Sequence, residues 1–256
     1  EPAPSWPRSV GPGASVSVMA GGSSIPDIAT FLQIGACSPV GYSWDGKDVY
    51  FASGMSGAPQ VYRINESGWP YQLTTFEDGM ESFTLSHDGK HAIVGAAVGG
   101  DENAQLYWMD TRTGRIVQLT KRPEVQYGSV VWTPDDKAIY CRSNEENGKD
   151  FFIYRMEIPS AEMKRVFGEK DGVNGQNAVA DLSDDGTQLV VSHATSNVNN
   201  DLFLVDLPSG KWQQLTKDDK DVAYDGVTLM KDNKTLWLTC NDNPDGLARL
   251  ATLTVG

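Results

Sequence analysis

Few residues of this 256-residue chain have the types and spacing that catalysis needs. The nearest approach to a serine nucleophile is Gly54-Met55-Ser56-Gly57. A serine exposed on a sharp strand-to-helix turn needs the pattern G-x-S-x-G, and here the second glycine arrives one residue early. The segment also falls between two expected strands. We therefore interpret Ser56 as a loop residue and predict no catalytic residue in this chain.

Three histidines, His87, His91 and His193, are the candidates for a general base or a metal ligand. Two of them flank a turn and the third ends an expected strand, so we interpret all three as surface or strand-end residues. The sequence contains no HExxH, no GxxxxGK[ST] and no GxGxxG motif. It therefore indicates neither a zinc-hydrolase site nor a nucleotide cradle, and we expect no cofactor.

One run imitates the first half of a calcium loop, with Asn241, Asn243 and Asp245 followed by Gly246. Calcium loops of the EF-hand type supply a bidentate carboxylate from the twelfth position, which here is Thr252. We therefore interpret the run as a polar loop between strands and predict no metal site.

Composition excludes several classes of function. The net charge is −13 and no run of Lys or Arg exceeds two residues, which argues against nucleic-acid binding. No apolar stretch approaches the ~18 residues of a membrane span. The three cysteines, Cys37, Cys141 and Cys240, are odd in number and lack CxxC spacing, so we expect neither a disulfide framework nor a zinc site. The start EPAPSWPRSV has no signal-peptide pattern; it fits a mature terminus after cleavage or a boundary of the sequence.

The elements that must position any site come from a repeat. An apolar run followed by a polar turn occurs five times, and the turn aspartates are Asp45, Asp88, Asp135, Asp185 and Asp232. They are 43, 47, 50 and 47 residues apart, a period typical of propeller blades. Three further short strand-like segments follow in most units. We predict an all-β propeller with about five four-stranded blades, the last incomplete, and expect Asp-Gly to form two-residue hairpins with positive φ.

The predicted boundaries place an extended arm at residues 1–29 and the propeller at residues 30–256. The expected blades span about 37–76, 80–121, 127–169, 177–217 and 224–256. The fifth has no fourth strand in the sequence, so either residues 15–18 (SVSV) close the ring or the chain is part of a larger propeller. Open blade edges would allow association into oligomers.

Polar residues stand just before the first strand of four blades. They are Glu81, Gln126, Gln176 and Asp225. Equivalent places in a ring lie around one mouth of its central channel. We predict that these four residues form a binding surface for a peptide or a protein domain, and ordinary polar loop residues are the alternative.

The strands around the turns resemble two related groups of propellers. The matching stretches are SWDGKDVYFAS with QVYRI and YQLTTF, SHDGKHAIVGA with QLYWMD and VQLT, TPDDKAIYC with IYRMEI, and SDDGTQLVVS with LFLVDL and QQLT. They are similar to the N-terminal propeller of prolyl oligopeptidase-family serine peptidases, including dipeptidyl and acylaminoacyl peptidases, and to the periplasmic Tol-system (TolB-like) propeller protein. We favour the peptidases because IATFLQIGACSPVGYSWDGKDVYF is similar to the start of their propellers.

The favoured resemblance implies a non-catalytic propeller that gates peptide access to an α/β-hydrolase domain, which this sequence lacks. The chain alone is then no enzyme, although its parent protein is a serine peptidase. The alternative is a free-standing, protein-binding propeller of the Tol type. A third is a lactonase-like propeller hydrolase, for which Glu81 and Asp225 are the channel carboxylates. A periplasmic or secreted location is favoured over a cytoplasmic one, with a peptide or protein as the partner.

Overall fold

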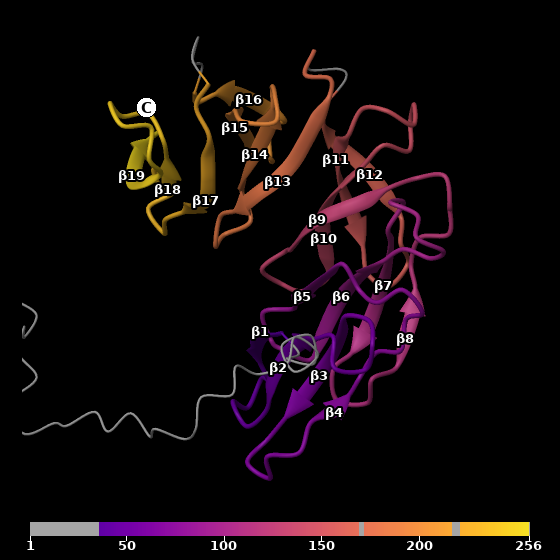
Figure 1. Cartoon of the computed structure of the whole chain (residues 1–256). Helices are drawn as coiled ribbons and strands as arrows, with labels where there is room; N and C mark the ends of the chain where they lie inside the picture. The colour runs from indigo at the N-terminus through magenta and orange to yellow at the C-terminus, as the bar shows by residue number, and fades with distance from the viewer. Residues whose placement is uncertain (1–35, 169–171, 217–220, 256) are drawn as a thin grey trace, which may run out of the picture. The chain divides into compact units, whose positions relative to one another are not determined.

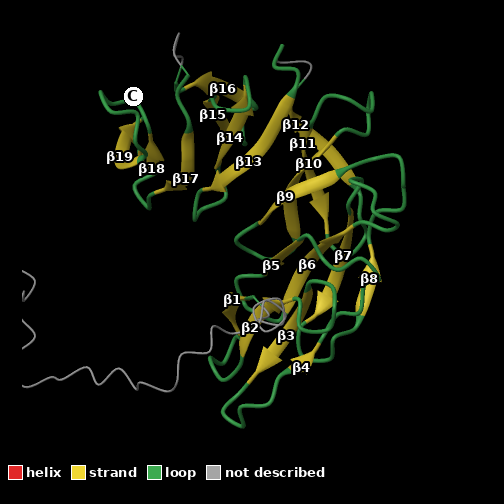
Figure 2. Cartoon of the chain, in the orientation of Figure 1, coloured by secondary structure: helices red, strands yellow, loops and turns green. Residues whose placement is uncertain are grey.

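The computed structural model describes residues 36–168, 172–216 and 221–255. These residues form 19 strands in five antiparallel sheets, and no helix occurs among them (Figure 2). The first three sheets contain, in order, β1 (Cys37–Tyr42), β2 (Val49–Ser53), β3 (Gln60–Ile64) and β4 (Tyr71–Gln72); β5 (Ser82–Leu85), β6 (His91–Ala96), β7 (Gln105–Asp110) and β8 (Ile116–Gln118); β9 (Tyr127–Trp132), β10 (Ala138–Ser143), β11 (Phe152–Glu157) and β12 (Met163–Phe167).

The last two sheets differ in their number of strands. They contain β13 (Gln176–Leu182), β14 (Gln188–Ala194), β15 (Asn200–Asp206) and β16 (Lys211–Gln214); then β17 (Tyr224–Leu229), β18 (Thr235–Cys240) and β19 (Arg249–Thr254). We number these sheets 1 to 5 in chain order. The first strand of each sheet contacts the first strand of the next, and within the described residues these strands follow the concave side of an arc (Figure 1).

This arrangement is a β-propeller of five blades, and it confirms the predicted fold class, including an incomplete fifth blade. The proposed closing strand at residues 15–18 and the arm at residues 1–29 lie outside the described residues. No helix in the described part of the chain is long and apolar enough to cross a membrane.

The core lies between adjacent sheets rather than inside a single one. One buried cluster joins sheets 2 and 3 through Ile93, Leu106, Ile139 and Phe152. Similar clusters fill the spaces between sheets 3 and 4 and between sheets 4 and 5. The second strands are therefore covered on both faces, as the nearly continuous burial of β6 and β10 shows.

The turn after each first strand differs from the expected two-residue hairpin. In sheet 1 the Ser43 N–H donates to Asp48 O at 2.9 Å, so residues 44–47 form a longer loop. The Gly46 N–H donates to Ser43 O at 2.9 Å, and Gly46 has a φ of 70°. Asp45 does not have a positive φ, so the aspartate is not there to adopt a left-handed backbone conformation.

That role is to hold the loop through its side chain. The Ser43 hydroxyl donates to Asp45 Oδ1 at 2.7 Å, and the same oxygen accepts the Lys47 N–H at 3.2 Å. The pattern recurs with Ser86–Asp88, Thr133–Asp135 and Ser183–Asp185. The fifth turn has Met230 in place of the hydroxyl residue, and there Asp232 binds Thr235 instead.

Successive turns also bind one another. Asp136, in the turn of sheet 3, accepts the N–H groups of His87 and Asp88 from the turn of sheet 2, at 2.9 and 3.0 Å. The Asn233 amide of sheet 5 donates to Asp185 of sheet 4 at 2.7 Å. These contacts join residues 48 or 49 positions apart and fix the spacing of neighbouring blades at one end.

The turn carboxylates should make stability depend on pH. Burial opposes the shift at Asp88, but the Lys90 N–H and the Ser86 hydroxyl outweigh it and lower the pKa of this carboxyl to about 2. The pKa of Asp45, Asp135, Asp185 and Asp232 is also lowered, chiefly by hydrogen bonds. Because these folded-state values lie below the unfolded value of about 3.9, the contribution is complete above pH ~4 and is lost as pH falls towards 2.

Asp88→Asn tests this dependence. We expect the variant to be less stable than the wild type by on the order of 1 kcal/mol at pH 7, after allowance for solvent screening. The difference should shrink as pH falls from about 4 to 2, when urea unfolding is followed by circular dichroism. A difference that stays constant over this range would contradict the proposed role of the carboxylate.

Candidate functional site

The four predicted mouth residues lie at the starts of the first strands. Glu81 directly precedes β5 and Gln126 precedes β9, while Gln176 and Asp225 are the first and second residues of β13 and β17. Glu81, Gln176 and Asp225 are exposed, and Gln126 is half-buried. Among the described residues no hydrogen bond or ion pair connects any two of them. The structure thus places them at equivalent positions without forming a compact catalytic cluster, and their binding role stays a prediction.

Gln126 is the most firmly positioned of the four. Its N–H donates to Asn144 Oδ1 at 2.8 Å, and its carbonyl accepts the Asn144 N–H at 3.4 Å. The preceding residue, Val125, is buried, and its carbonyl accepts the side-chain amide of Gln105 at 2.8 Å. Backbone contacts on both sides therefore fix Gln126 without involving the groups of its side chain.

Glu81 is the predicted mouth residue with a perturbed acidity. Burial, and then the negative charge of Glu102, raises the pKa of its carboxyl. Its N–H donates to Gly95 O at 2.8 Å, which continues the ladder of β5 and β6 by one residue. A raised pKa can favour hydrogen-bond donation by a carboxyl group, but the described residues provide no nucleophile in contact with Glu81.

Two side chains near the same strand ends were not predicted as site residues. Arg142 in β10 pairs with Gly128 of β9, and its guanidinium lies 4.7 Å from the centre of the Phe151 ring. Its Nε is buried with no hydrogen-bond partner in the described part of the chain, and burial lowers its pKa. The sequence contained a signal for this residue, because Arg142 directly follows the apolar run AIYC within one expected strand.

The second is His193 in β14, which pairs with Asn177 of β13. His193 Nδ1 lies 3.0 Å from Asn177 Oδ1, and the amide nitrogen of Asn177 donates to the carbonyls of Phe151 and Val173. Burial lowers the pKa of the His193 imidazole. A neutral imidazole held by an amide can bind a polar group, and nothing in this contact activates a nucleophile.

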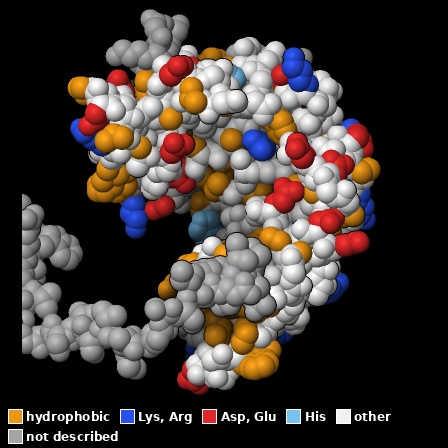
Figure 3. All heavy atoms as spheres, viewed as in Figure 1, with side chains coloured by type: hydrophobic (Ala, Val, Ile, Leu, Met, Phe, Trp, Pro, Cys, Tyr) orange, Lys and Arg blue, Asp and Glu red, His pale blue; other side chains and the backbone are white. Residues whose placement is uncertain are grey.

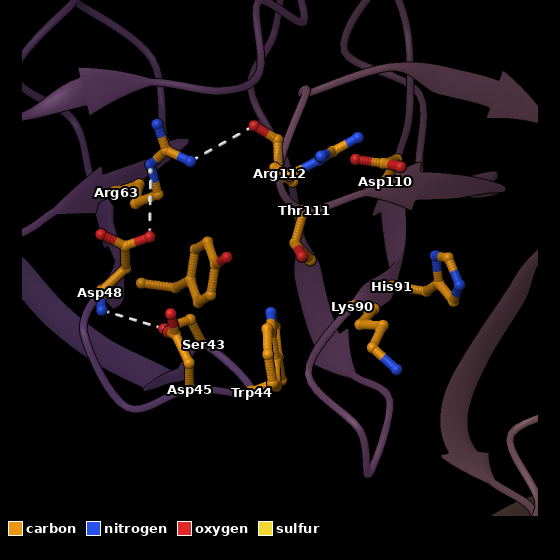
Figure 4. Close-up of a pocket in the computed structure, with 11 residues that line it drawn as sticks. Ser43, Trp44, Asp45, Asp48, Arg63, Lys90, His91, Asp110, Thr111 and Arg112 are labelled. Carbon is orange, nitrogen blue, oxygen red and sulfur yellow. Dashed lines mark hydrogen bonds and ion pairs between the residues drawn. The ribbon is translucent and has the colours of Figure 1, made fainter.

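A separate pocket of about 480 Å³ lies between sheets 1 and 2 (Figure 4). Its lining includes Tyr50, Arg63 and Lys90, and the guanidinium of Arg63 lies 3.9 Å from Asp48 and donates to Arg112 O at 3.3 Å. Cationic and anionic side chains alternate around it, so the pocket favours neither strongly anionic nor strongly cationic ligands.

The same pocket contains the three residue types of a hydrolytic triad, in Ser43, Asp45 and His91. The Ser43 hydroxyl, however, donates directly to Asp45, and the described residues show no hydrogen bond from His91 to either. His91 instead packs against Trp108, with ring centres 5.0 Å apart. A nucleophilic serine needs an adjacent base, so these three residues are not arranged as a triad.

The calcium-like run is a loop with protein partners. Asn241 Oδ1 accepts the Ala223 N–H at 2.8 Å, and Asp245 forms an ion pair with Arg249. Thr252 lies in β19. No group of three or more His, Cys, Asp or Glu residues among the described ones is arranged to hold a metal ion. Cys141 is buried, which raises the pKa of its thiol to about 12 and makes it unreactive.

Comparison with known families decides what this propeller is. Residues 77–246, more than half of the chain, match the family model described as prolyl oligopeptidase, N-terminal β-propeller domain. The chain belongs to that family. The match begins before β5 and ends after β18, so it includes sheets 2 to 4 and the first two strands of sheet 5. The resemblance seen in the turns and strands is thereby confirmed. A search of curated proteins by sequence found no match.

Solved structures similar to this prolyl oligopeptidase-family propeller come from both expected groups. TolB from Acinetobacter baumannii is 24% identical with a TM-score of 0.57, and 86% of this chain covers 54% of that one. A structure from an analysis of two prolyl endopeptidases is 17% identical with a TM-score of 0.66. The match covers 87% of this chain and 35% of that one. Putative TolB from Agrobacterium tumefaciens is 17% identical with a TM-score of 0.61. The match covers 86% of this chain and 77% of that one. The chain thus spans about half and a third of the first two proteins, and the likeness establishes the fold.

Proposed function

We propose that this chain is the non-catalytic propeller portion of a prolyl oligopeptidase-like serine peptidase. In this proposal it gates peptide access to an α/β-hydrolase domain that lies outside these 256 residues. The observation that carries the proposal is the family match over residues 77–246. If the parent protein completes these blades into a ring, its narrow channel would admit short or extended peptides and exclude folded proteins, which would restrict the peptidase to small substrates.

The polar ends of the first strands are the proposed contact surface for peptides or for the hydrolase domain. Gln126 and Gln176 offer amide donors and acceptors to a peptide backbone. Arg142 supplies a nearby cation whose Nε has no hydrogen-bond partner among the described residues. Together with Glu81 and Asp225, these groups suit recognition of extended polar chains and supply no nucleophile of their own.

One experiment with a fluorophosphonate probe tests this function. The purified 256-residue protein should show only background labelling and no peptidyl cleavage. In an extract of the source, an antibody against this chain should detect a probe-labelled species larger than 27.8 kDa by roughly 250 residues, the size of a further domain. Specific labelling of the purified chain would refute the non-catalytic role.

The second candidate is a free-standing propeller that binds a partner protein, in the periplasm or outside the cell. The likeness to the Agrobacterium TolB structure, of which this chain covers 77%, supports it. It predicts an unlabelled native species at 27.8 kDa that co-purifies with one protein. That result would replace the peptidase proposal.

A further inference from the structure

One arginine stands where the other blades have small, uncharged residues. Arg142 follows the turn aspartate Asp135 at a fixed distance in the repeat. The residues at the same distance from the turn aspartates of the other sheets are Ala52, Gly95, Ser192 and Thr239. Tyr140, two residues earlier on the same face of β10, is buried in the cluster between sheets 3 and 4. Arg142 therefore faces sheet 4, at the mouth end of the interface between these two sheets.

The surroundings of Arg142 fit a guanidinium group. Arg142 pairs with Gly128 of β9, and a Cβ on Gly128 would already lie 3.5 Å from Arg142 Nε, so a longer side chain there has no room. The guanidinium carbon lies 4.7 Å from the centre of the Phe151 ring, which is 5% exposed. The Phe151 N–H donates to Gly175 O at 2.7 Å, and its carbonyl accepts the Asn177 amide at 2.8 Å. The segment that leads into sheet 4 thus fixes the ring beside the guanidinium.

The positive charge of Arg142 has no counter-charge in the structure. Within residues 36–168, 172–216 and 221–255 it forms no ion pair, and its buried Nε makes no hydrogen bond, although the residue as a whole is half-buried. Two other arginines of sheet 3 differ in this respect, because Arg155 pairs with Glu157 and Arg165 with Glu146. A buried charge is costly unless it is paired, so the position of Arg142 favours an added anion.

Gln126 lies beside this cation. Arg142 is opposite Gly128 in the ladder, and the backbone contacts of Gln126 with Asn144 continue the same ladder by two residues. Alternate residues of a strand face the same way, and diagonal neighbours on one face are within reach of long side chains. The Gln126 amide can therefore bind the backbone of a chain whose anionic group binds Arg142.

His193 faces the same gap from sheet 4. Val191, two residues earlier on the same face of β14, belongs to the cluster between sheets 3 and 4. Burial lowers the pKa of the His193 imidazole, so near neutral pH it adds no second positive charge to that of Arg142. One planar cation suits a singly charged carboxylate, which it can bind through two parallel N–H groups, better than a phosphate group with nearly two charges.

We propose that Arg142 binds a carboxylate of a peptide at the mouth, either an acidic side chain or a free C-terminus. The proposal rests on the proposed function, in which peptides pass this end of the propeller. Acidic side chains are common on the face of the arc viewed in Figure 3, and the net charge is −13. The chain as a whole therefore repels acidic peptides, so a preference for them has to come from a short-range contact.

Three pentapeptides test the proposal on the 256-residue protein at ~0.15 M salt, which screens the long-range repulsion. They are acetyl-Gly-Gly-Glu-Gly-Gly-amide, its Gln counterpart, and that Gln peptide with a free C-terminus. Nuclear magnetic resonance titration of the ¹⁵N-labelled protein gives each dissociation constant. At least one carboxylate peptide should bind roughly fivefold or more tightly than the neutral one, with shifts at the Gly128 and Gly175 amides. The tighter peptide identifies the source of the carboxylate. Equal affinities for all three peptides, or binding by none, would overturn the proposal.

Arg142→Met removes the charge and keeps a long side chain beside Phe151. This variant should bind the three peptides with equal affinity, whereas Arg142→Lys, which lacks the planar fork, should keep only part of the preference. Arg115→Met is the matched control. It removes the same charge at the opposite end of sheet 2, where the Arg115 carbonyl accepts the Asp110 N–H, and should keep the full preference.

Thermal unfolding distinguishes a ligand-binding role from a structural one. Arg142→Met should unfold at the same temperature as the wild type or at a higher one, because it removes a charge that has no partner among the described residues. A clear fall in the unfolding temperature would make Arg142 a structural residue, and a peptide preference that survives in Arg142→Met would contradict the assignment. Neither result depends on the probe-labelled species in the source extract, so this proposal and the peptidase proposal can fail separately.

Discussion

Replacing Phe152 with alanine is expected to lower the free energy of unfolding by about 3–5 kcal/mol. Phe152 lies in β11 and is 0% exposed within the cluster that joins sheets 2 and 3. A Cβ on Gly168 would overlap with its ring, and the guanidinium of Arg165 lies 5.4 Å from the ring centre. The ring is therefore enclosed on several sides. Truncation to alanine leaves a cavity there, and the backbone at Gly168 cannot easily move to fill it.

Urea unfolding followed by tryptophan fluorescence measures this loss. Phe152→Leu keeps most of the apolar volume and should cost less than half as much as the alanine variant. Trp69→Ala, at a side chain that is 68% exposed, should change stability by no more than about 0.5 kcal/mol. A loss below about 1 kcal/mol for Phe152→Ala would mean that the interface between sheets 2 and 3 contributes little to stability.

The blades could be predicted from the sequence because their turn chemistry is local. The hydroxyl of Ser43 and the carboxylate of Asp45 are two residues apart, and their hydrogen bond shapes one loop. The same short-range contact recurs in four turns, so it leaves a periodic pattern. The type of turn was predicted wrongly, because the Asp-Gly pair alone does not reveal that the preceding hydroxyl residue extends the loop to residues 44–47.

Contacts between blades could not be predicted in the same way. Asp136 accepts two N–H groups from a turn 48 or 49 residues earlier, and no local pattern marks it as an acceptor. The mouth residues were found from their position before each first strand. Arg142 was not considered and His193 was interpreted as a strand-end residue, because both lie at the far ends of second strands. Only the strand register places them beside the starts of β9 and β13.

Gln105→Leu is expected to destabilise the protein by about 2–4 kcal/mol, although the side chain is similar in size. Gln105 is 8% exposed, and its amide nitrogen donates to the carbonyls of Asn103, Arg122 and Val125. Its carbonyl accepts the Arg122 N–H at 3.2 Å. Leucine can replace none of these contacts, so buried backbone groups between β8 and β9 would lose their partners.

The effect should be local as well as global, because this connection leads directly to Gln126. Amide hydrogen exchange should speed up first over residues 119–127, before exchange in sheet 4 changes. Gln118→Leu, at an exposed position of β8 in the same sheet, is the matched control and should change stability by less than about 0.5 kcal/mol. If both variants behaved alike, the buried amide would not be what holds the connection between blades. If only Gln105→Leu loosens residues 119–127, one side chain couples the packing of sheets 2 and 3 to the proposed peptide-binding mouth.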